Sequence, residues 1–120
     1  MKKCLVVDDV EVTRFIVEQI VTSLGMGILA VATPEEATEI LHKHAIDVVI
    51  LDWHLRKSSG IDLLKNIKAS LGTSVKVIVF SGVEGSDKET EARHAGADAF
   101  MEKPTTKENL EKCLKNLGVL

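Results

Sequence analysis

Five short apolar runs alternate with longer segments of helical spacing, and this alternation constrains the fold more than any other feature of the chain. The runs cover residues 4–7, 28–32, 47–51, 75–80 and 97–101, of which the last is the weakest. Apolar runs of this length, rich in β-branched residues and bounded by turn or charge signals, are typical of strands buried on both faces. A parallel sheet requires such strands, so the chain is predicted to contain one.

The segments between the runs carry the signals of helix starts and helix faces. Thr33, followed by Pro34 and Glu36, predicts a capping box at the start of the second helix. Residues 105–108 repeat that pattern at the start of the last helix. Ile16 and Ile20 lie four residues apart and predict the buried stripe of the first helix.

A strand followed by a helix, repeated along the whole chain, predicts an α/β fold. Right-handed crossover connections place helices on both faces of a single parallel sheet. No linker or low-complexity tract interrupts the pattern, so residues 1–120 are predicted to form one domain. In open sheets of this kind the functional crevice lies at the carboxyl ends of the strands. The residues that directly follow each strand are therefore the candidates for a functional site.

The composition excludes several classes of protein. With 45% hydrophobic and 28% charged residues, the chain is typical of a soluble globular domain. Its net charge of -3 gives no reason to expect direct nucleic-acid or membrane binding. No stretch resembles a membrane span or a signal peptide, and Cys4 and Cys113 lack the spacing of a metal or redox site. Reduced cysteines and a cytoplasmic location are predicted.

The residues that follow the strands form an unusual set. Asp8 and Asp9 follow the first strand, Asp52 the third, Ser81 the fourth and Lys103 the fifth. Carboxylates on neighbouring strands repel one another unless a cation lies between them. A hard divalent ion is the simplest solution, and Mg²⁺ is expected because it prefers oxygen ligands and keeps waters that a phosphate can displace.

This set also meets the needs of phosphoryl transfer. Transfer requires a positioned acceptor oxygen and positive charge on the equatorial phosphoryl oxygens. Asp52 is the expected nucleophile, Lys103 and Mg²⁺ the charge stabilisers, and Ser81 a hydrogen-bond donor. Taken singly, each residue has a commonplace alternative as a helix cap, loop residue or surface charge. Their occurrence together at different strand ends favours a shared site.

Several motifs along the whole chain resemble the CheY-like receiver domains of two-component response regulators. Residues 5–9 resemble the first strand with its acidic pair, and residues 48–52 resemble the strand that ends in the phosphoacceptor, with Gly60 at the usual distance beyond it. Residues 77–82 match the fourth strand with its hydroxyl residue, and 95–104 carry the Gly-Ala turn, an aromatic residue and Lys-Pro. The resemblance implies a flavodoxin-like (βα)5 fold with strand order 2-1-3-4-5.

The resemblance also implies the roles of individual residues. It assigns Mg²⁺ coordination to Asp9, Asp52 and the backbone carbonyl of His54, with Asp8 acting partly through water. It implies a cis peptide bond between Lys103 and Pro104, a linkage at which the cis form costs little.

Switching is expected to involve Ser81 and Phe100. In the family, the hydroxyl residue moves to the phosphoryl group and the aromatic residue fills the vacated space. The change would alter the surface formed by the fourth helix, the fifth strand and the fifth helix. Phe100 has plain core packing as its alternative, and a phosphorylation-dependent homodimer through that surface is left open.

Two positions are expected to tune loss of the phosphoryl group. His54 and Val83 lie two residues after Asp52 and Ser81, and flank the route of an attacking water. Val83 offers no hydrogen bond to orient that water, so slow self-dephosphorylation is expected. The chain also departs from the family at residues 55–56, where Leu-Arg replaces the frequent Met-Pro pair.

The predicted function is a signalling module that receives a phosphoryl group on Asp52 from a histidine kinase or phosphotransfer protein. It would act by altered binding to a downstream protein or output domain, and its only chemistry would be its own phosphorylation and dephosphorylation. One alternative is a scaffold of the same fold that works without phosphorylation. Another is a metal-dependent phosphatase with an aspartyl-phosphate intermediate, but His54 stands where such enzymes usually carry a second aspartate. The sequence identifies neither the kinase nor the target.

Overall fold

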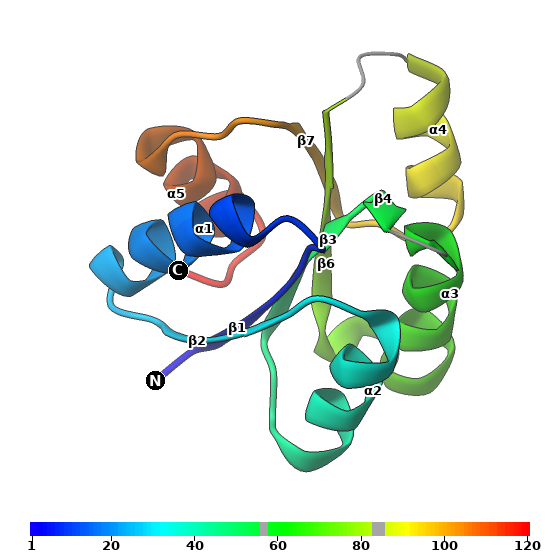
Figure 1. Cartoon of the computed structure of the whole chain (residues 1–120), viewed down its shortest axis with the longest axis horizontal. Coiled ribbons are helices and arrows are strands. Elements are labelled where there is room, and N and C mark those ends of the chain that lie inside the picture. The colour runs from blue at the N-terminus through cyan, green and yellow to red at the C-terminus, as the bar shows by residue number, and fades with distance from the viewer. Residues whose placement is uncertain (56–57, 83–85) are drawn as a thin grey trace.

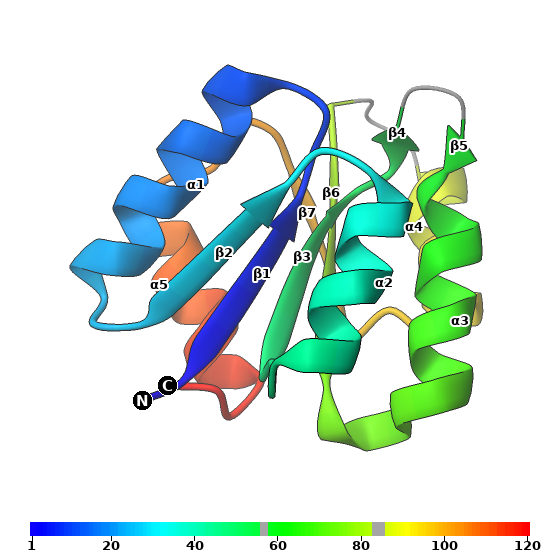
Figure 2. The ribbon, with the colours of Figure 1, turned by 60° about the horizontal axis from the view of Figure 1, so that its bottom comes forward.

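The computed structural model describes residues 1–55, 58–82 and 86–120, with only the backbone described at 58–59 and 86–87. Its centre is a five-stranded parallel sheet of order β2-β1-β3-β6-β7 (Figure 2). The strands are β1 (Lys3–Val7), β2 (Gly27–Val31), β3 (Val48–Asp52), β6 (Lys76–Ser81) and β7 (Ala99–Glu102). Numbered along the chain, these strands have the predicted order 2-1-3-4-5, so the flavodoxin-like fold is confirmed.

The register brings the strand ends level at one edge of the sheet. Val7 pairs with Leu51, Asp52 with Phe80 and Ser81 with Glu102. The residues that follow β1, β3, β6 and β7 therefore emerge side by side. This alignment is what allows side chains that are far apart in sequence to form one site.

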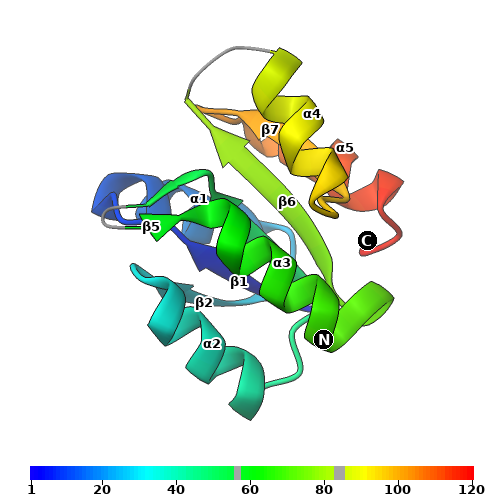
Figure 3. The ribbon, with the colours of Figure 1, turned by 90° about the vertical axis from the view of Figure 1, so that its right-hand side faces the viewer.

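Helices cover both faces of the sheet, as predicted (Figures 1 and 3). One face carries α1 and α5, and the other carries α2, α3 and α4. Their bounds are α1 (Glu11–Ser23), α2 (Pro34–Lys43), α3 (Gly60–Leu71), α4 (Ser86–His94) and α5 (Lys107–Asn116), with a 3-10 turn at Gly72–Ser74. None of the helices in the described residues is long and apolar enough to cross a membrane.

Alternating residues of each central strand supply two separate cores. In β1, Leu5 and Val7 pack into the core under α2 and α3, while Cys4 and Val6 pack into the core under α1 and α5. This alternation follows from the two-residue period of a strand. Burial on both faces explains the continuous apolar runs in the sequence.

One half of the predicted capping box forms at α2, where the Glu36 N–H donates to Thr33 Oγ1 at 3.2 Å. The Glu36 carboxylate reaches back to the Thr33 hydroxyl at 3.1 Å and to the Ala32 N–H at 3.4 Å, one amide before that of the standard motif. At α5 the cap lies one residue later than the 105–108 pattern predicted, because the Thr106 hydroxyl accepts from the Asn109 N–H at 3.1 Å. Both hydroxyls lie three residues before the amide that they bind, as N-caps do.

The predicted buried stripe of α1 is wrong by one position. Val17 and Val21 are buried, whereas Ile20 is half-buried and Ile16 is 42% exposed. Both pairs have the four-residue spacing of a helix face, so spacing alone does not select between them. Packing against the sheet and α5 selects the valines, and one residue of helical rotation, about 100°, turns Ile16 outward.

A short two-stranded sheet lies beyond β3. Its strands are β4 (His54–Leu55) and β5 (Ser58–Ser59), which pair antiparallel. Leu55 is buried in the core under α2 and α3, which anchors this segment without a proline. Arg56 lies outside the described residues.

Candidate functional site

Side chains from four strand ends meet at the carboxyl edge of the sheet. Asp8 and Asp9 follow β1, Asp52 ends β3, Ser81 ends β6 and Lys103 follows β7. Asp8, Asp52 and Ser81 are buried. One carboxylate oxygen from each of the three aspartates lies within 4.8 Å of the other two. The structure thus brings together the residues that the sequence placed in one site.

Lys103 bridges two of the carboxylates. Its Nζ donates to Asp8 Oδ2 at 2.6 Å and forms an ion pair with Asp52 Oδ1 at 3.2 Å. The Lys103 N–H donates to the Ser81 carbonyl at 2.9 Å, and the peptide bond between Lys103 and Pro104 is cis. The bond to Ser81 ties the Lys103 backbone to the end of β6.

Both carboxylate oxygens of Asp8 and its backbone carbonyl accept hydrogen bonds. Its Oδ1 accepts from the Val10 N–H at 2.8 Å, while Oδ2 accepts from Lys103. Its carbonyl oxygen accepts from Arg14 Nη1 at 2.6 Å. Arg14 does not stand out in the sequence, because no local motif indicates which carbonyl a helical arginine will reach.

The backbone around Asp52 is equally fixed. Its Oδ1 accepts from the His54 N–H at 3.2 Å. The Trp53 N–H donates to the Phe80 carbonyl at 2.8 Å, and the Trp53 carbonyl accepts from the Gly60 N–H at 3.1 Å. The start of α3 is thereby tied to the residue after Asp52.

The electrostatics of the site favour a proton or another cation on Asp52. Burial, followed by the charge of Asp8, raises the pKa of Asp52 above its ordinary value, against the opposing influence of Lys103 and the His54 amide. For Lys103, burial lowers the pKa, but the hydrogen bond to Asp8 and the charges of Asp52 and Asp8 outweigh it, so the net pKa is raised. Lys103 therefore stays protonated, and the carboxylates retain an excess of negative charge.

We predict that Asp52→Asn stabilises the metal-free chain at pH 7. Because the folded pKa of Asp52 lies above the unfolded one, the folded state binds more protons between the two values, and stability falls as pH rises through that window. The amide removes this penalty and should raise the melting temperature, by about 4 °C for each kcal/mol gained.

Thermal unfolding in EDTA between pH 4 and pH 7 measures the difference in melting temperature between Asp52→Asn and the unmodified chain. This difference should become smaller as the pH falls. Asp47→Asn is the control, since the Asp47 carboxylate accepts from the Lys3 N–H at the opposite edge of the sheet and its loss should not stabilise. An Asp52→Asn advantage that stayed constant across this pH range would contradict the prediction.

The donor set of the site fits a hard divalent cation. Three carboxylates face one ammonium, which leaves a net negative charge in a largely buried place. Oxygen ligands of this kind suit Mg²⁺, which also keeps part of its water shell. The described residues therefore supply what the predicted cofactor requires.

The other predicted site residues lie around this centre. Phe100 is half-buried on β7 and packs against the core under α2 and α3, while its neighbour Met101 packs against the opposite core. The His54 side chain is exposed on β4. Val83 lies outside the described residues, so its expected influence on dephosphorylation stays a prediction.

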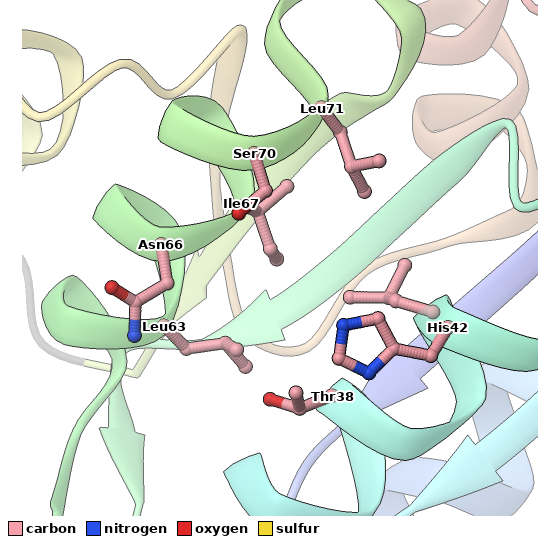
Figure 4. A pocket seen from close by; sticks show the side chains of 8 residues that line it. Thr38, His42, Leu63, Asn66, Ile67, Ser70 and Leu71 are labelled. Carbon is pink, nitrogen blue, oxygen red and sulfur yellow. The ribbon is translucent and has the colours of Figure 1, made fainter.

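Among the described residues, a groove lies on each face of the sheet. The first runs beside Lys103 between α1 and the segment after β7, and is lined by Thr13, Ile16, Val17, Phe80, Lys103, Pro104 and Thr105. The second lies between α2 and α3, where Leu63 and Ile67 face an opening rimmed by Thr38, His42 and Ser70 (Figure 4). Of these two grooves, the first reaches Lys103, which contacts Asp8 and Asp52.

A family model for the response regulator receiver domain matches residues 4–115. The chain belongs to this family. Receiver domains accept phosphoryl groups as signalling modules and generally bind Mg²⁺ at an acidic pocket, and this structure holds a cluster of three carboxylates, from Asp8, Asp9 and Asp52.

Individual relatives agree with this assignment. The receiver domain is 33% identical to chemotaxis protein CheY-3 of Vibrio cholerae over 96% of this chain and 93% of the relative. It is 28% identical to the sensory/regulatory protein RpfC of Xanthomonas campestris over 98% of this chain, but spans only 16% of RpfC. A CheY-like receiver domain protein from Methanospirillum hungatei superposes with a TM-score of 0.89 at 25% identity, covering 98% of this chain and 94% of that chain.

Proposed function

We propose that Asp52 is the phosphoacceptor of this receiver domain and that Asp8, Asp9 and Asp52 hold the Mg²⁺ ion, together with the backbone carbonyl of His54. The observation that carries the proposal is the contact of Lys103 Nζ with both Asp8 and Asp52, at 2.6 and 3.2 Å. It places a fixed positive charge beside the acceptor oxygen. Mg²⁺ would supply further positive charge to the phosphoryl oxygens.

The reaction follows from these positions. A carboxylate oxygen of Asp52 attacks the phosphorus of a phosphohistidine, the new P–O bond forms, and the P–N bond to the imidazole breaks. Lys103 stabilises the charge on the equatorial oxygens, and the Ser81 hydroxyl donates to one of them once the phosphoryl group is in place. Burial of Asp52 strengthens each of these electrostatic interactions.

The signal would leave through the surface formed by α4, β7 and α5. Ser81 ends β6 and pairs with Glu102 of β7, so a movement of Ser81 acts directly on the strand that carries Phe100. Phe100 would follow that movement on the side of the sheet that α4 covers. Altered binding of a downstream protein, or of a second copy, is the expected output.

Incubation with acetyl phosphate and Mg²⁺ tests the proposal. The receiver domain should gain the mass of one phosphoryl group, whereas Asp52→Asn and an EDTA-treated sample should not. A scaffold that works without phosphorylation would gain nothing in any sample. Continuous hydrolysis of a generic phosphoester would instead favour the phosphatase alternative.

The protein that donates the phosphoryl group is expected to bind on α1. Among the described residues, the exposed large apolar side chains include four neighbours within 10–16, namely Val10, Val12, Phe15 and Ile16. They directly follow Asp8 and Asp9, and Ile16 also lines the groove that reaches Lys103. Exposed apolar patches of this kind mark protein interaction sites. A histidine kinase or phosphotransfer protein seated there would present its histidine to Asp52.

We predict that Phe15→Ser slows phosphorylation by a protein donor while leaving phosphorylation by acetyl phosphate unchanged. Phe15 is 60% exposed, so its loss should not disturb the fold. An aromatic side chain that becomes buried in a complex contributes tenfold or more to affinity, roughly 2 kcal/mol. Phosphorylation rates of the variant and the unmodified chain are measured separately with the cognate kinase and with acetyl phosphate. Leu120→Ala is the control, because Leu120 is an exposed apolar residue outside this patch. Equal slowing with both donors would disprove a docking role.

A further inference from the structure

Arg14 holds the backbone that joins the two aspartates after β1. Its Nη1 donates to the Asp8 carbonyl at 2.6 Å from the beginning of α1. The Asp8 carbonyl and the Asp9 N–H belong to a single planar peptide group. A donor fixed on this carbonyl therefore restrains the orientation of the peptide group that joins Asp8 to Asp9. The orientation of the two carboxylates relative to each other depends on that plane.

This peptide lies just beyond the sheet. The Asp8 N–H still donates to the Val31 carbonyl at 3.1 Å, which continues the pairing of β1 with β2. On the carbonyl side of Asp8, the guanidinium of Arg14 takes the place of a strand partner. The Asp8 side chain is held independently by Val10 and Lys103. Arg14 thus restrains the peptide plane, which these side-chain contacts do not hold.

We propose that Arg14 is a positioning residue for the divalent-cation site, acting through the Asp8–Asp9 peptide. The inference rests on the proposed function, because it takes the aspartate cluster as the Mg²⁺ site. A positive charge near a dication repels it, so the charge of Arg14 alone would weaken Mg²⁺ binding. The restraint on the peptide strengthens binding by keeping the ligands in place. The two effects have opposite signs, and removal of Arg14 shows which one dominates.

The choice of cation gives a second readout. Mg²⁺ demands nearly ideal octahedral geometry, whereas Ca²⁺ accepts irregular and flexible coordination. Loss of a restraint on ligand geometry should therefore weaken Mg²⁺ binding more than Ca²⁺ binding. A change of charge or of overall stability should affect both ions alike.

Titration of Arg14→Met with each ion, followed by Trp53 fluorescence or by calorimetry, tests the proposal. Mg²⁺ binding should weaken roughly three- to tenfold, the range expected for one hydrogen bond, and Ca²⁺ binding should weaken less. Arg14→Gln, whose amide is too short to reach the carbonyl, should behave in the same way, and it serves if the first variant folds poorly. Arg14→Lys keeps one donor and should retain most of the affinity.

Arg93→Met is the matched control, since Arg93 pairs with Glu89 on α4 and its loss should leave both affinities unchanged. Mg²⁺ binding by Arg14→Met that equals or exceeds that of the unmodified chain would overturn the proposal, as would equal losses for the two ions. If the unmodified chain itself bound no Mg²⁺ and gained no phosphoryl group, the proposed function would fail instead. The two failures are therefore distinguishable.

Discussion

Lys103→Met should slow phosphorylation by acetyl phosphate roughly 10²–10³-fold, the cost of removing one donor aimed at a developing charge. The methionine keeps the length of the stem but removes the ammonium that contacts Asp8 and Asp52. The metal-free variant should also lose about 3 kcal/mol of stability, because two buried carboxylates lose their counter-charge. Mg²⁺ binding should be unchanged or tighter, since a competing cation is gone.

Lys68→Met is a matched control for this substitution. Lys68 forms an ion pair with Asp98 at 2.6 Å, and its side chain is 18% exposed, against 20% for Lys103. Its Nζ also donates to the Val75 carbonyl, which places it near the start of β6, at the edge of the sheet opposite the site. The Lys68→Met variant should lose stability but accept the phosphoryl group at the normal rate.

Phosphorylation rates, thermal unfolding and Mg²⁺ titration of the two lysine variants separate catalysis from stability. If Lys103→Met kept the normal rate, Lys103 would not stabilise the transferring phosphoryl group. If Lys68→Met lost as much rate as Lys103→Met, the effect would reflect folding and not the site.

Gly60→Ala should destabilise the fold and impair phosphorylation together. A Cβ at Gly60 would lie 2.5 Å from the Asp52 carbonyl oxygen, and 3.2 Å from both the Cα and the carbonyl oxygen of Trp53. These neighbours are backbone atoms of the central sheet and its exit, so they cannot turn aside as a side chain would. The start of α3 must move, at a cost of about 1–3 kcal/mol.

The movement would also reach the acceptor. The Gly60 N–H donates to the Trp53 carbonyl, so displacement of α3 breaks a bond to the residue next to Asp52. Denaturant unfolding and the acetyl phosphate reaction measure the two effects. Gly82→Ala is the control for stability, because a Cβ at Gly82 meets nothing within 4 Å. Equal unfolding free energies for the two alanine variants would show that the close approach at Gly60 is not restrictive.

The sequence predicted the architecture because its signals are local. A strand buried on both faces must be continuously apolar, and the predicted cap at Thr33 is formed within a single turn. The alignment of parallel strand ends then follows from the topology, so the meeting of Asp8, Asp52 and Lys103 could be anticipated without coordinates. Local spacing did not predict the buried face of α1, because Ile16 and Ile20 satisfy the helical period as well as Val17 and Val21 do.

The sequence by itself determined the parallel sheet and the residues that gather at its carboxyl edge, because periodicity and chain order carry that information. The strand order came from the resemblance to receiver domains. Only the tertiary structure decided which atoms touch there. Lys103 contacts Asp8 more closely than Asp52, Arg14 binds the Asp8 carbonyl, and Gly60 lies against the Asp52 backbone. Each of these contacts depends on the packed positions of separate elements, and ångström differences in those positions leave no trace in residue spacing.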